Sequence, residues 1–280
     1  MRGDVSEIDR SGIRIRAKEE DLHLARVNHS ASTKEIGPSD LVIVSVKTTS
    51  NQDLIQLIPP LLRSETMLLT LQNGFGNEDF LAENFGEERV LGALCFVCVV
   101  RTSPGVIEDY YPGRIRLGEH NRGPQPRTHD LAREFRRCGV DCEVVENLAL
   151  ERWRKLIWNI PFNGLAIAAG GIDTAGILSD PGLHGECVGL MEEVIGAAEK
   201  CGFIMPDGVI PAEIERTQSM GAYKPSTLVD FEAGRPLEIE AIWGEPLRRA
   251  EAAGANAPRM TALYRKLNEI ESKRFEKTGK

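Results

Sequence analysis

The feature that most constrains the fold is a change of pattern near residue 147. Before it, apolar runs of strand length alternate with segments of helical periodicity, and after it nearly every segment has helical periodicity. Strands that alternate with helices favour a parallel sheet, whereas a run of helices favours a bundle. The sequence therefore predicts two domains, an α/β domain over residues 1–146 and an all-α domain over residues 147–280.

Several apolar runs predict the strands of the first domain. Residues 39–47 are rich in β-branched side chains between polar neighbours, which is typical of a strand buried on both faces of a parallel sheet. Residues 67–72 and 90–100 are expected to form further strands. Residues 106–111 and 114–118 flank a Pro-Gly pair, a pattern that predicts a hairpin. Ligands of such sheets bind beyond the carboxyl ends of the strands, so polar residues there are of interest.

The charge pattern argues against two broad classes of protein. The 280 residues carry a formal net charge of −8 with no basic block, which argues against nucleic acid as the partner. The sequence has no run of about 18 apolar residues, so no membrane-spanning helix is expected. The polar first residues do not resemble a signal peptide. We therefore expect a cytoplasmic protein that binds a small molecule.

The six cysteines allow two interpretations. Cys95 and Cys98 form a C-x-x-C pair, but they lie in a predicted strand, where positions three apart face opposite sides. The sequence has no second pair of this kind to complete a metal site. Buried free thiols in a cytosolic protein are therefore favoured over a metal or redox site, and no metal is expected.

Polar residues at intervals of four interrupt an otherwise apolar helix in the second domain. Lys155, Asn159 and Asn163 drift by only about 40° per step around a helix, so one ammonium and two carboxamides share a face. Such a face suits the binding and protonation of a polar small molecule. The alternative, an exposed lysine with two solvated amides, fits the spacing equally well.

Further polar residues follow the ends of two predicted strands. Lys47 ends the first apolar run, and an Asn-Gly-Phe-Gly turn beginning at Asn73 follows the second. Glycine there lets the backbone approach a ligand closely. Both positions are therefore candidate nucleotide or substrate contacts, although ordinary turn chemistry explains them as well.

A third group of polar residues surrounds a Gly-Arg-Pro turn at 234–236. Ser226 and Asp230 precede this turn, and Glu238 follows it. Pro236 and Glu238 are typical of a first helical turn, where proline fits and the helix dipole favours a carboxylate. A capped helix start accounts for these two residues, but not for so many polar groups beside apolar ones.

Five motifs occur in order along nearly the whole chain. They are V-K at 46–47, L-Q-N-G-F-G at 71–76, R-T-S-P-G at 101–105, W-R-K-L-x-x-N-x-x-x-N at 153–163, and K-P-S-T-L-x-D-x-x-x-G-R-P-x-E-I at 224–239. In this order they resemble the ketopantoate reductases (2-dehydropantoate 2-reductases). The resemblance implies a Rossmann-like parallel-sheet domain that binds NADP, followed by a helical domain. It also implies reduction of a 2-oxo acid by NADPH to give pantoate, on the route to pantothenate and coenzyme A.

The resemblance implies a role for each matched residue. Lys155 would be the general acid that protonates the developing alkoxide, and Glu238 would position Lys155 or its substrate. Asn73 would bridge cofactor and substrate, and Lys47 would lie near the nucleotide. The substrate hydroxyl and carboxylate would be held by Asn159, Asn163 and Ser226.

Two departures from the family pattern bear on these roles. Asp173 stands near a position where the family often has an asparagine, and a carboxylate would repel an anionic 2-oxo acid. The family's opening strand, G-x-G-x-x-G loop and helix have no counterpart in the sequence, so Arg2-Gly3 aligns with an Arg-Gly pair that follows its second strand. The first domain is therefore expected to be an N-terminally truncated Rossmann-like fold, with residues 40–46 at an unpaired edge. Arg2 is then a candidate cofactor contact.

Two alternatives to this function stay open. Without a phosphate loop, the chain could be a non-catalytic truncated homologue that acts as a binding or oligomerising protein. The departure at Asp173 leaves room for a reductase of another 2-oxo acid. A homodimer, paired through the helical half, is a further expectation.

Overall fold

The computed structural model describes residues 5–17, 21–110 and 113–278, and it divides into two compact units. All the described strands belong to the first unit, which comprises Met1–Ser45, Asp53–Leu71 and Leu81–Leu148. The second unit comprises Val46–Gln52, Gln72–Phe80 and Ala149–Lys280. Two short segments that lie early in the sequence therefore group with the helices, and these segments carry Lys47 and Asn73.

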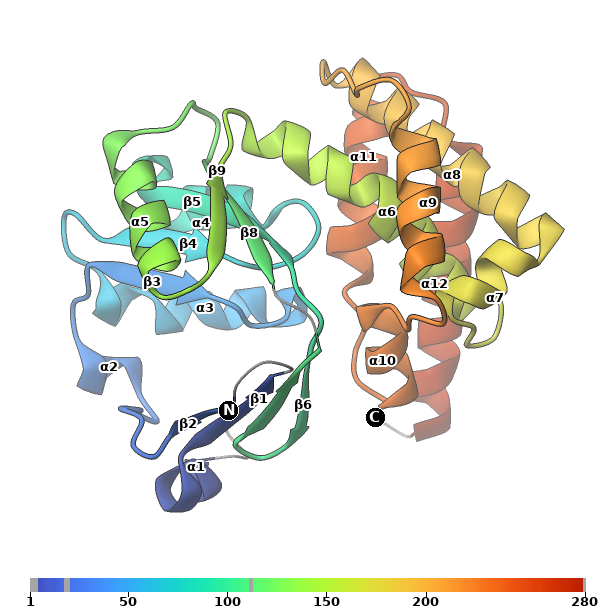
Figure 1. The fold of residues 1–280 in the computed structure, drawn as a ribbon. Coiled ribbons are helices and arrows are strands. Elements are labelled where there is room, and N and C mark those ends of the chain that lie inside the picture. Colours follow the sequence, from blue (N-terminus) through green and yellow to red (C-terminus); the bar gives the residue numbers. More distant parts are fainter. Residues whose placement is uncertain (1–4, 18–20, 111–112, 279–280) are drawn as a thin grey trace. The chain divides into compact units, whose positions relative to one another are not determined.

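The first unit contains a five-stranded sheet (Figure 1). In sheet order its strands are β3 (Leu41–Val44), β4 (Met67–Thr70), β5 (Val90–Phe96), β8 (Arg114–Glu119) and β9 (Asp141–Val144). The first three are parallel, β8 is antiparallel to β5, and β9 is parallel to β8. Leu69, Leu91 and Leu117 are fully buried in its core, beside Leu131 of α5 (Pro126–Arg137). The Rossmann-like sheet expected from the sequence is confirmed.

A second sheet of four strands shows that the predicted hairpin was wrong. In sheet order its strands are β2 (Leu22–Leu24), β1 (Ile13–Ala17), β7 (Val106–Asp109) and β6 (Val99–Ser103). β7 pairs with β6 and β1, whereas β8 pairs with β5 and β9. The tight turn lies instead between β6 and β7, where Gly105 has a φ of 72° that glycine adopts without steric cost. The predicted strand at 90–100 accordingly divides into β5 and β6, because the chain changes sheets there.

The strand predicted at 39–47 is shorter and less buried than expected. β3 covers four residues, and only Val44 among them is buried, whereas Ile43 is 46% exposed. β3 ends the sheet order and, within the described residues, pairs only with β4. The edge position is confirmed. Burial on both faces was wrong, because Val44 lies on a buried face and Ile43 on an exposed one.

The second unit is built from helices around one apolar core. Trp153, Phe162 and Trp243 are among its fully buried side chains, and α8 contacts α7, α9, α11 and α12. Among the described residues, no helix combines the length and apolarity needed to cross a membrane. Its helices are α6 (Leu148–Ala168), α7 (Thr174–Ser179), α8 (Pro181–Lys200), α9 (Val209–Met220), α10 (Ser226–Glu232), α11 (Glu245–Ala252) and α12 (Pro258–Thr278). The remaining helices are α1 (Val5–Ser11), α2 (Thr33–Ile36), α3 (Asn51–Leu57) and α4 (Asn77–Phe85).

The helix expected to begin near Pro236 begins later. A π-helical segment, Glu240–Gly244, leads directly into α11, and Glu238 lies outside the helix, with its carbonyl accepting from Ile242 N at 3.1 Å. The expectation that Pro236 and Glu238 form a first helical turn was therefore wrong. Glu238 is instead free to point its carboxylate at another segment.

Candidate active site

The ammonium of Lys155 and the carboxamide of Asn73 come together from distant parts of the chain. Lys155 lies on α6, Asn73 lies in the loop between β4 and α4, and Lys155 Nζ donates to Asn73 Oδ1 at 2.9 Å. Both residues are partly buried. The contact orients the ammonium of Lys155 toward the loop that carries Asn73.

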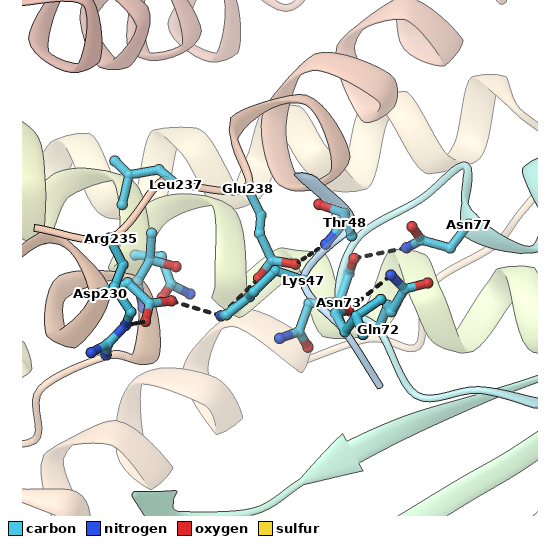
Figure 2. Close-up of polar contacts among 12 residues, drawn as sticks. Lys47, Thr48, Gln72, Asn73, Asn77, Asp230, Arg235, Leu237 and Glu238 are labelled. Carbon is cyan, nitrogen blue, oxygen red and sulfur yellow. Dashed lines mark hydrogen bonds and ion pairs between the residues drawn. The ribbon is translucent and has the colours of Figure 1, made fainter. Parts of the chain in front are cut away.

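Lys47 is held by two buried carboxylates (Figure 2). Its Nζ lies 2.6 Å from Asp230 Oδ2 and 3.0 Å from Glu238 Oε2. The other oxygen of Glu238 accepts from the backbone N–H of Thr48 at 2.9 Å, and the other oxygen of Asp230 accepts from Arg235 Nε at 2.7 Å. The partners of Glu238 within the described chain are thus Lys47 and Thr48, and not Lys155.

The charge state of Lys47 follows from these partners. Burial lowers the pKa of Lys47, but the carboxylates of Glu238 and Asp230 raise it by more, so its pKa lies above the ordinary value. Lys47 is therefore a cation at neutral pH. Its side chain is still 46% exposed, which leaves it accessible to a ligand.

The two asparagines of the polar face on α6 differ in what they can still bind. Asn163 is buried and engaged on both sides, because its Nδ2 donates to Asn159 O at 3.1 Å and its Oδ1 accepts from Thr227 N at 3.2 Å. Asn159 is only 8% exposed, and its carboxamide has no hydrogen-bond partner within the part of the chain that the structure describes. Burial excludes the alternative of two solvated amides. The polar atoms of this carboxamide are not among the fully buried atoms without a partner, so they are accessible to a ligand.

Ser226 and Asp230 lie one turn apart on α10 and so share a face of that helix. Ser226 is exposed, and its hydroxyl has no hydrogen-bond partner among the described residues. The contact between Thr227 and Asn163 ties the start of α10 to α6. α10 thus contacts α6 through Thr227 next to Ser226, and it contacts Lys47 through Asp230.

Asp173 has a structural explanation. It is the N-cap of α7, and its Oδ1 accepts from Gly176 N at 2.9 Å. An N-cap carboxylate satisfies a backbone donor and interacts favourably with the helix dipole. The sequence departure at this position is therefore a helix cap.

Comparison with known proteins identifies the family. The family model described as "Ketopantoate reductase PanE/ApbA" matches residues 1–122, and the one described as "Ketopantoate reductase PanE/ApbA C terminal" matches residues 147–271. The chain belongs to the ketopantoate reductase family. Family members are oxidoreductases, and the order of the five motifs agrees with this membership.

Individual members of the ketopantoate reductase family cover nearly the whole chain. A 2-dehydropantoate 2-reductase of Nostoc sp. is 33% identical over 278 residues, which are 98% of this chain and 87% of that protein. The crystal structure of a 2-dehydropantoate 2-reductase from Geobacter metallireducens is 40% identical, with a TM-score of 0.93 over 96% of this chain and 90% of that one. A D-mandelate dehydrogenase solved with NADH and anilino(oxo)acetate is 20% identical with a TM-score of 0.87 over 98% of this chain and 89% of that one, which shows a shared fold.

In this member of the ketopantoate reductase family, the loop of Asn73 is held by a contact with Ala241 that the sequence did not predict. Gly74 has a φ of 82°, and a Cβ there would lie 2.1 Å from the carbonyl oxygen of Ala241. The next backbone N–H, that of Phe75, donates to the same carbonyl at 2.9 Å. Gly74 is thus required for packing against the π-helical segment, a contact between residues so distant in sequence that no local pattern indicates it.

A buried ion pair anchors the same loop from α6. Arg152 donates to the carbonyl of Gln72 at 2.8 Å and pairs with Glu78, and both charged side chains are buried. An arginine on the same helix face as Lys155 and Asn159, three residues before Lys155, was the available signal. Arg152 therefore fixes the loop that places Asn73 next to Lys155.

The predictions for Arg2 and for the cysteines do not involve the contacts described above. Arg2, the remaining candidate cofactor residue, lies outside the described residues. Within the described ranges, no group of three or more His, Cys, Asp or Glu side chains is arranged to hold a metal ion. Cys95 and Cys98 are partly buried free thiols.

Proposed function

We propose that this chain reduces 2-dehydropantoate to pantoate with NADPH, and that Lys155 donates the proton. The observation that carries the proposal is the contact between Lys155 and Asn73, which joins the helix motif and the strand-end motif of the family in one site. Family membership supports the same reaction. The proposed residues are those predicted from the sequence, with roles adjusted to their observed partners.

Asn73 and Lys47 follow β4 and β3 in the chain and suit contact with the nicotinamide end of a cofactor. Polar residues that follow the strands of open α/β sheets commonly bind nucleotides, and the amide nitrogen of Asn73 has no hydrogen-bond partner among the described residues. When bound, the cofactor supplies the hydride. We assign Asn73 to the contact with cofactor and substrate, and we assign Lys47 to the approach of the nucleotide.

Side chains on α6 and α10 of the same unit account for the other half of the reaction. We assign Lys155 to protonation of the oxygen of the reduced carbonyl, because an ammonium both donates the proton and stabilises the negative charge that develops. Asn159 supplies an unused carboxamide for the substrate hydroxyl. Ser226 supplies an unused hydroxyl for the substrate carboxylate.

Glu238 and Asn163 act through other residues in this proposal. Glu238 holds Lys47 and the backbone of Thr48, so it positions the segment after β3. Asn163 holds the backbone of Thr227, so it positions Ser226. Lys47 and Arg235 pair with the carboxylates of Asp230 and Glu238, and this neutralises negative charge that would otherwise repel an anionic 2-oxo acid.

The proposal is tested with the whole chain in two measurements. The first follows oxidation of NADPH and of NADH with 2-dehydropantoate and with other 2-oxo acids, including one with an aromatic substituent. We expect the highest kcat/KM with 2-dehydropantoate and NADPH, and a higher value for another acid would reassign the substrate. The second is a fluorescence titration with NADPH, in which no binding would establish a non-catalytic homologue. The cytoplasmic location and the homodimer stay predictions, the latter measurable by sedimentation.

A further inference from the structure

A chain of side-chain amides connects the segment after β3 with the loop that carries Asn73. Gln72 Nε2 donates to Asn51 Oδ1 at 2.7 Å, and Asn51 Nδ2 donates to Asn77 Oδ1 at 3.1 Å. Asn77 Nδ2 then donates to the backbone carbonyl of Asn73 at 3.0 Å, the contact drawn between the two labelled residues in Figure 2. The second N–H of Gln72 donates to Val46 O at 2.9 Å. Three donations therefore lead from Gln72 to the carbonyl of Asn73, and a fourth leads from Gln72 to the carbonyl of Val46.

The inner positions of this chain need side chains that both accept and donate a hydrogen bond. Asn51 and Asn77 each accept on the oxygen and donate from the nitrogen, which neither an ionised carboxylate nor a hydrocarbon can do. Gln72 is 5% exposed and Asn77 is 1% exposed, so water does not replace a missing link at these residues. Aligned hydrogen bonds polarise one another, and a buried polar group left unpaired is unfavourable. The amides of Gln72 and Asn77 are therefore held by one another and by backbone carbonyls, and not by water.

The place where the chain ends gives it a consequence for the site. The Asn73 carbonyl accepts from Asn77, while the Asn73 side-chain oxygen accepts from Lys155. Fixing the carbonyl fixes the backbone from which the side chain projects. The other end of the chain holds the carbonyl of Val46, the residue before Lys47.

We propose that Asn51 and Asn77 are positioning residues that set the backbone at Asn73, so that its carboxamide meets Lys155. The role in turnover rests on the proposed function, in which Lys155 donates the proton. The role in ordering the loop does not depend on turnover.

The test compares Asn77→Ala and Asn51→Ala with a matched control. Asn268→Ala is the control, because Asn268 Nδ2 donates to the carbonyl four residues earlier at 2.9 Å, as Asn77 does, but lies on α12 and outside the chain of amides. Asn51 is only partly buried and is the first residue of α3, so Asn51→Ala tests the same chain if Asn77→Ala does not fold. Each variant is examined by steady-state kinetics with 2-dehydropantoate and NADPH and by hydrogen–deuterium exchange of the ligand-free protein.

We expect both test variants to lower kcat by roughly tenfold to a hundredfold, the scale of a small misplacement of a reacting group, with a much smaller change in KM. Exchange at residues 72–77 should rise in both, whereas the control should change neither quantity. A second set of variants is made in an Asn73→Ala background. There Asn77→Ala should lower kcat by no more than about twofold further, because residues that act through one another are not additive.

Each outcome bears on one proposal. Unchanged exchange and unchanged kcat in both test variants would overturn the positioning role, as would a full additional loss of kcat in the Asn73→Ala background. If the unsubstituted chain turns over no 2-oxo acid, the proposed function fails. Even in a chain without activity, exchange at residues 72–77 that rises in the test variants and not in the control would establish that the amides order the loop.

Discussion

Two clusters of charged side chains in this chain differ in role: the one around Glu119 is structural, and the one around Lys47 belongs to the candidate site. At the end of β8, the buried carboxylate of Glu119 accepts from Arg127, Arg122 and Thr128. In the helical unit, Asp230 and Glu238 share the half-exposed Lys47. The first cluster surrounds a carboxylate with donors and leaves it no capacity for a ligand. The second leaves an exposed cation in a unit that also contains the unpaired groups of Asn159 and Ser226, and this spare capacity distinguishes a site from a structural ion pair.

The pKa of Glu119 is lowered and that of Lys47 is raised, and in both clusters the charged partners outweigh the effect of burial. Burial alone raises the pKa of Glu119, but hydrogen bonds from Arg127 and Thr128 and the charges of Arg127 and Arg122 outweigh it and hold the pKa below its ordinary value. Burial alone lowers the pKa of Lys47, and its carboxylate partners outweigh it in the other direction. In both clusters the partners keep the group charged, so both interactions stabilise the fold at neutral pH.

The largest expected effect tests whether Lys155 of the helical unit donates the proton. Lys155→Ala should lower kcat roughly 10²-fold or more, because a general acid contributes on this scale, while the melting temperature changes little. Arg154→Ala is the matched control, since its side chain is partly exposed one position earlier on the same helix and pairs with Glu151. Steady-state kinetics measures both variants. Near-normal turnover of Lys155→Ala would remove this residue from the mechanism.

The second effect tests whether the cluster around Lys47 serves activity. Glu238→Gln should lower kcat/KM by roughly tenfold to a hundredfold, the equivalent of a lost charge-assisted hydrogen bond, because it weakens the hold on Lys47 and Thr48. Glu240→Gln is the comparison variant, because Glu240 pairs with Arg248 and Tyr264 at the surface. Equal kinetic losses in the two variants would show that the effect is not specific to the Lys47 cluster.

The third prediction concerns the cluster around Glu119, so stability changes and activity does not. Glu119→Gln should lower the free energy of unfolding by about 2 kcal/mol at neutral pH and leave kcat unchanged. The folded pKa of Glu119 is lowered, so its stabilisation is present above the ordinary value of 4.5 and is lost as pH falls through the folded pKa. Urea unfolding of both proteins from pH 7 to below 4.5 measures this. A difference that persists unchanged into acid would contradict the assignment.

The smallest effect tests the stability of the exposed cluster. Lys47→Met should lower the free energy of unfolding by less than about 1 kcal/mol at neutral pH, because the ammonium is half exposed. The folded pKa of Lys47 is raised, so its stabilisation is complete below the ordinary value of 10.5 and is lost as pH rises through the folded pKa. Unfolding measured on both sides of pH 10.5 should show the two proteins converging in alkali. A gap that widens there would refute the ion-pair account.

The candidate site divides into parts that local patterns indicate and parts that they cannot. A spacing of four on α6 predicted the shared face of Lys155, Asn159 and Asn163, because helical geometry is set by neighbours in sequence. The same spacing does not indicate that the side chain of Asn163 accepts from Thr227 N, while that of Asn159 has no hydrogen-bond partner among the described residues. That difference depends on where α10 packs. The predicted hairpin failed for a similar reason, because strand pairing is a contact between segments and not a property of either one.

The sequence by itself determined the alternation of strands and helices, the helical second half and the family motifs, because periodicity and short motifs are recorded in neighbouring residues. Only the tertiary structure decided that Lys47 lies between Asp230 and Glu238, and that Asn73 meets Lys155. It also decided that the segments after β3 and β4 group with the helices. These contacts join residues 82 to 191 positions apart, and such contacts form only when packing brings separate segments together.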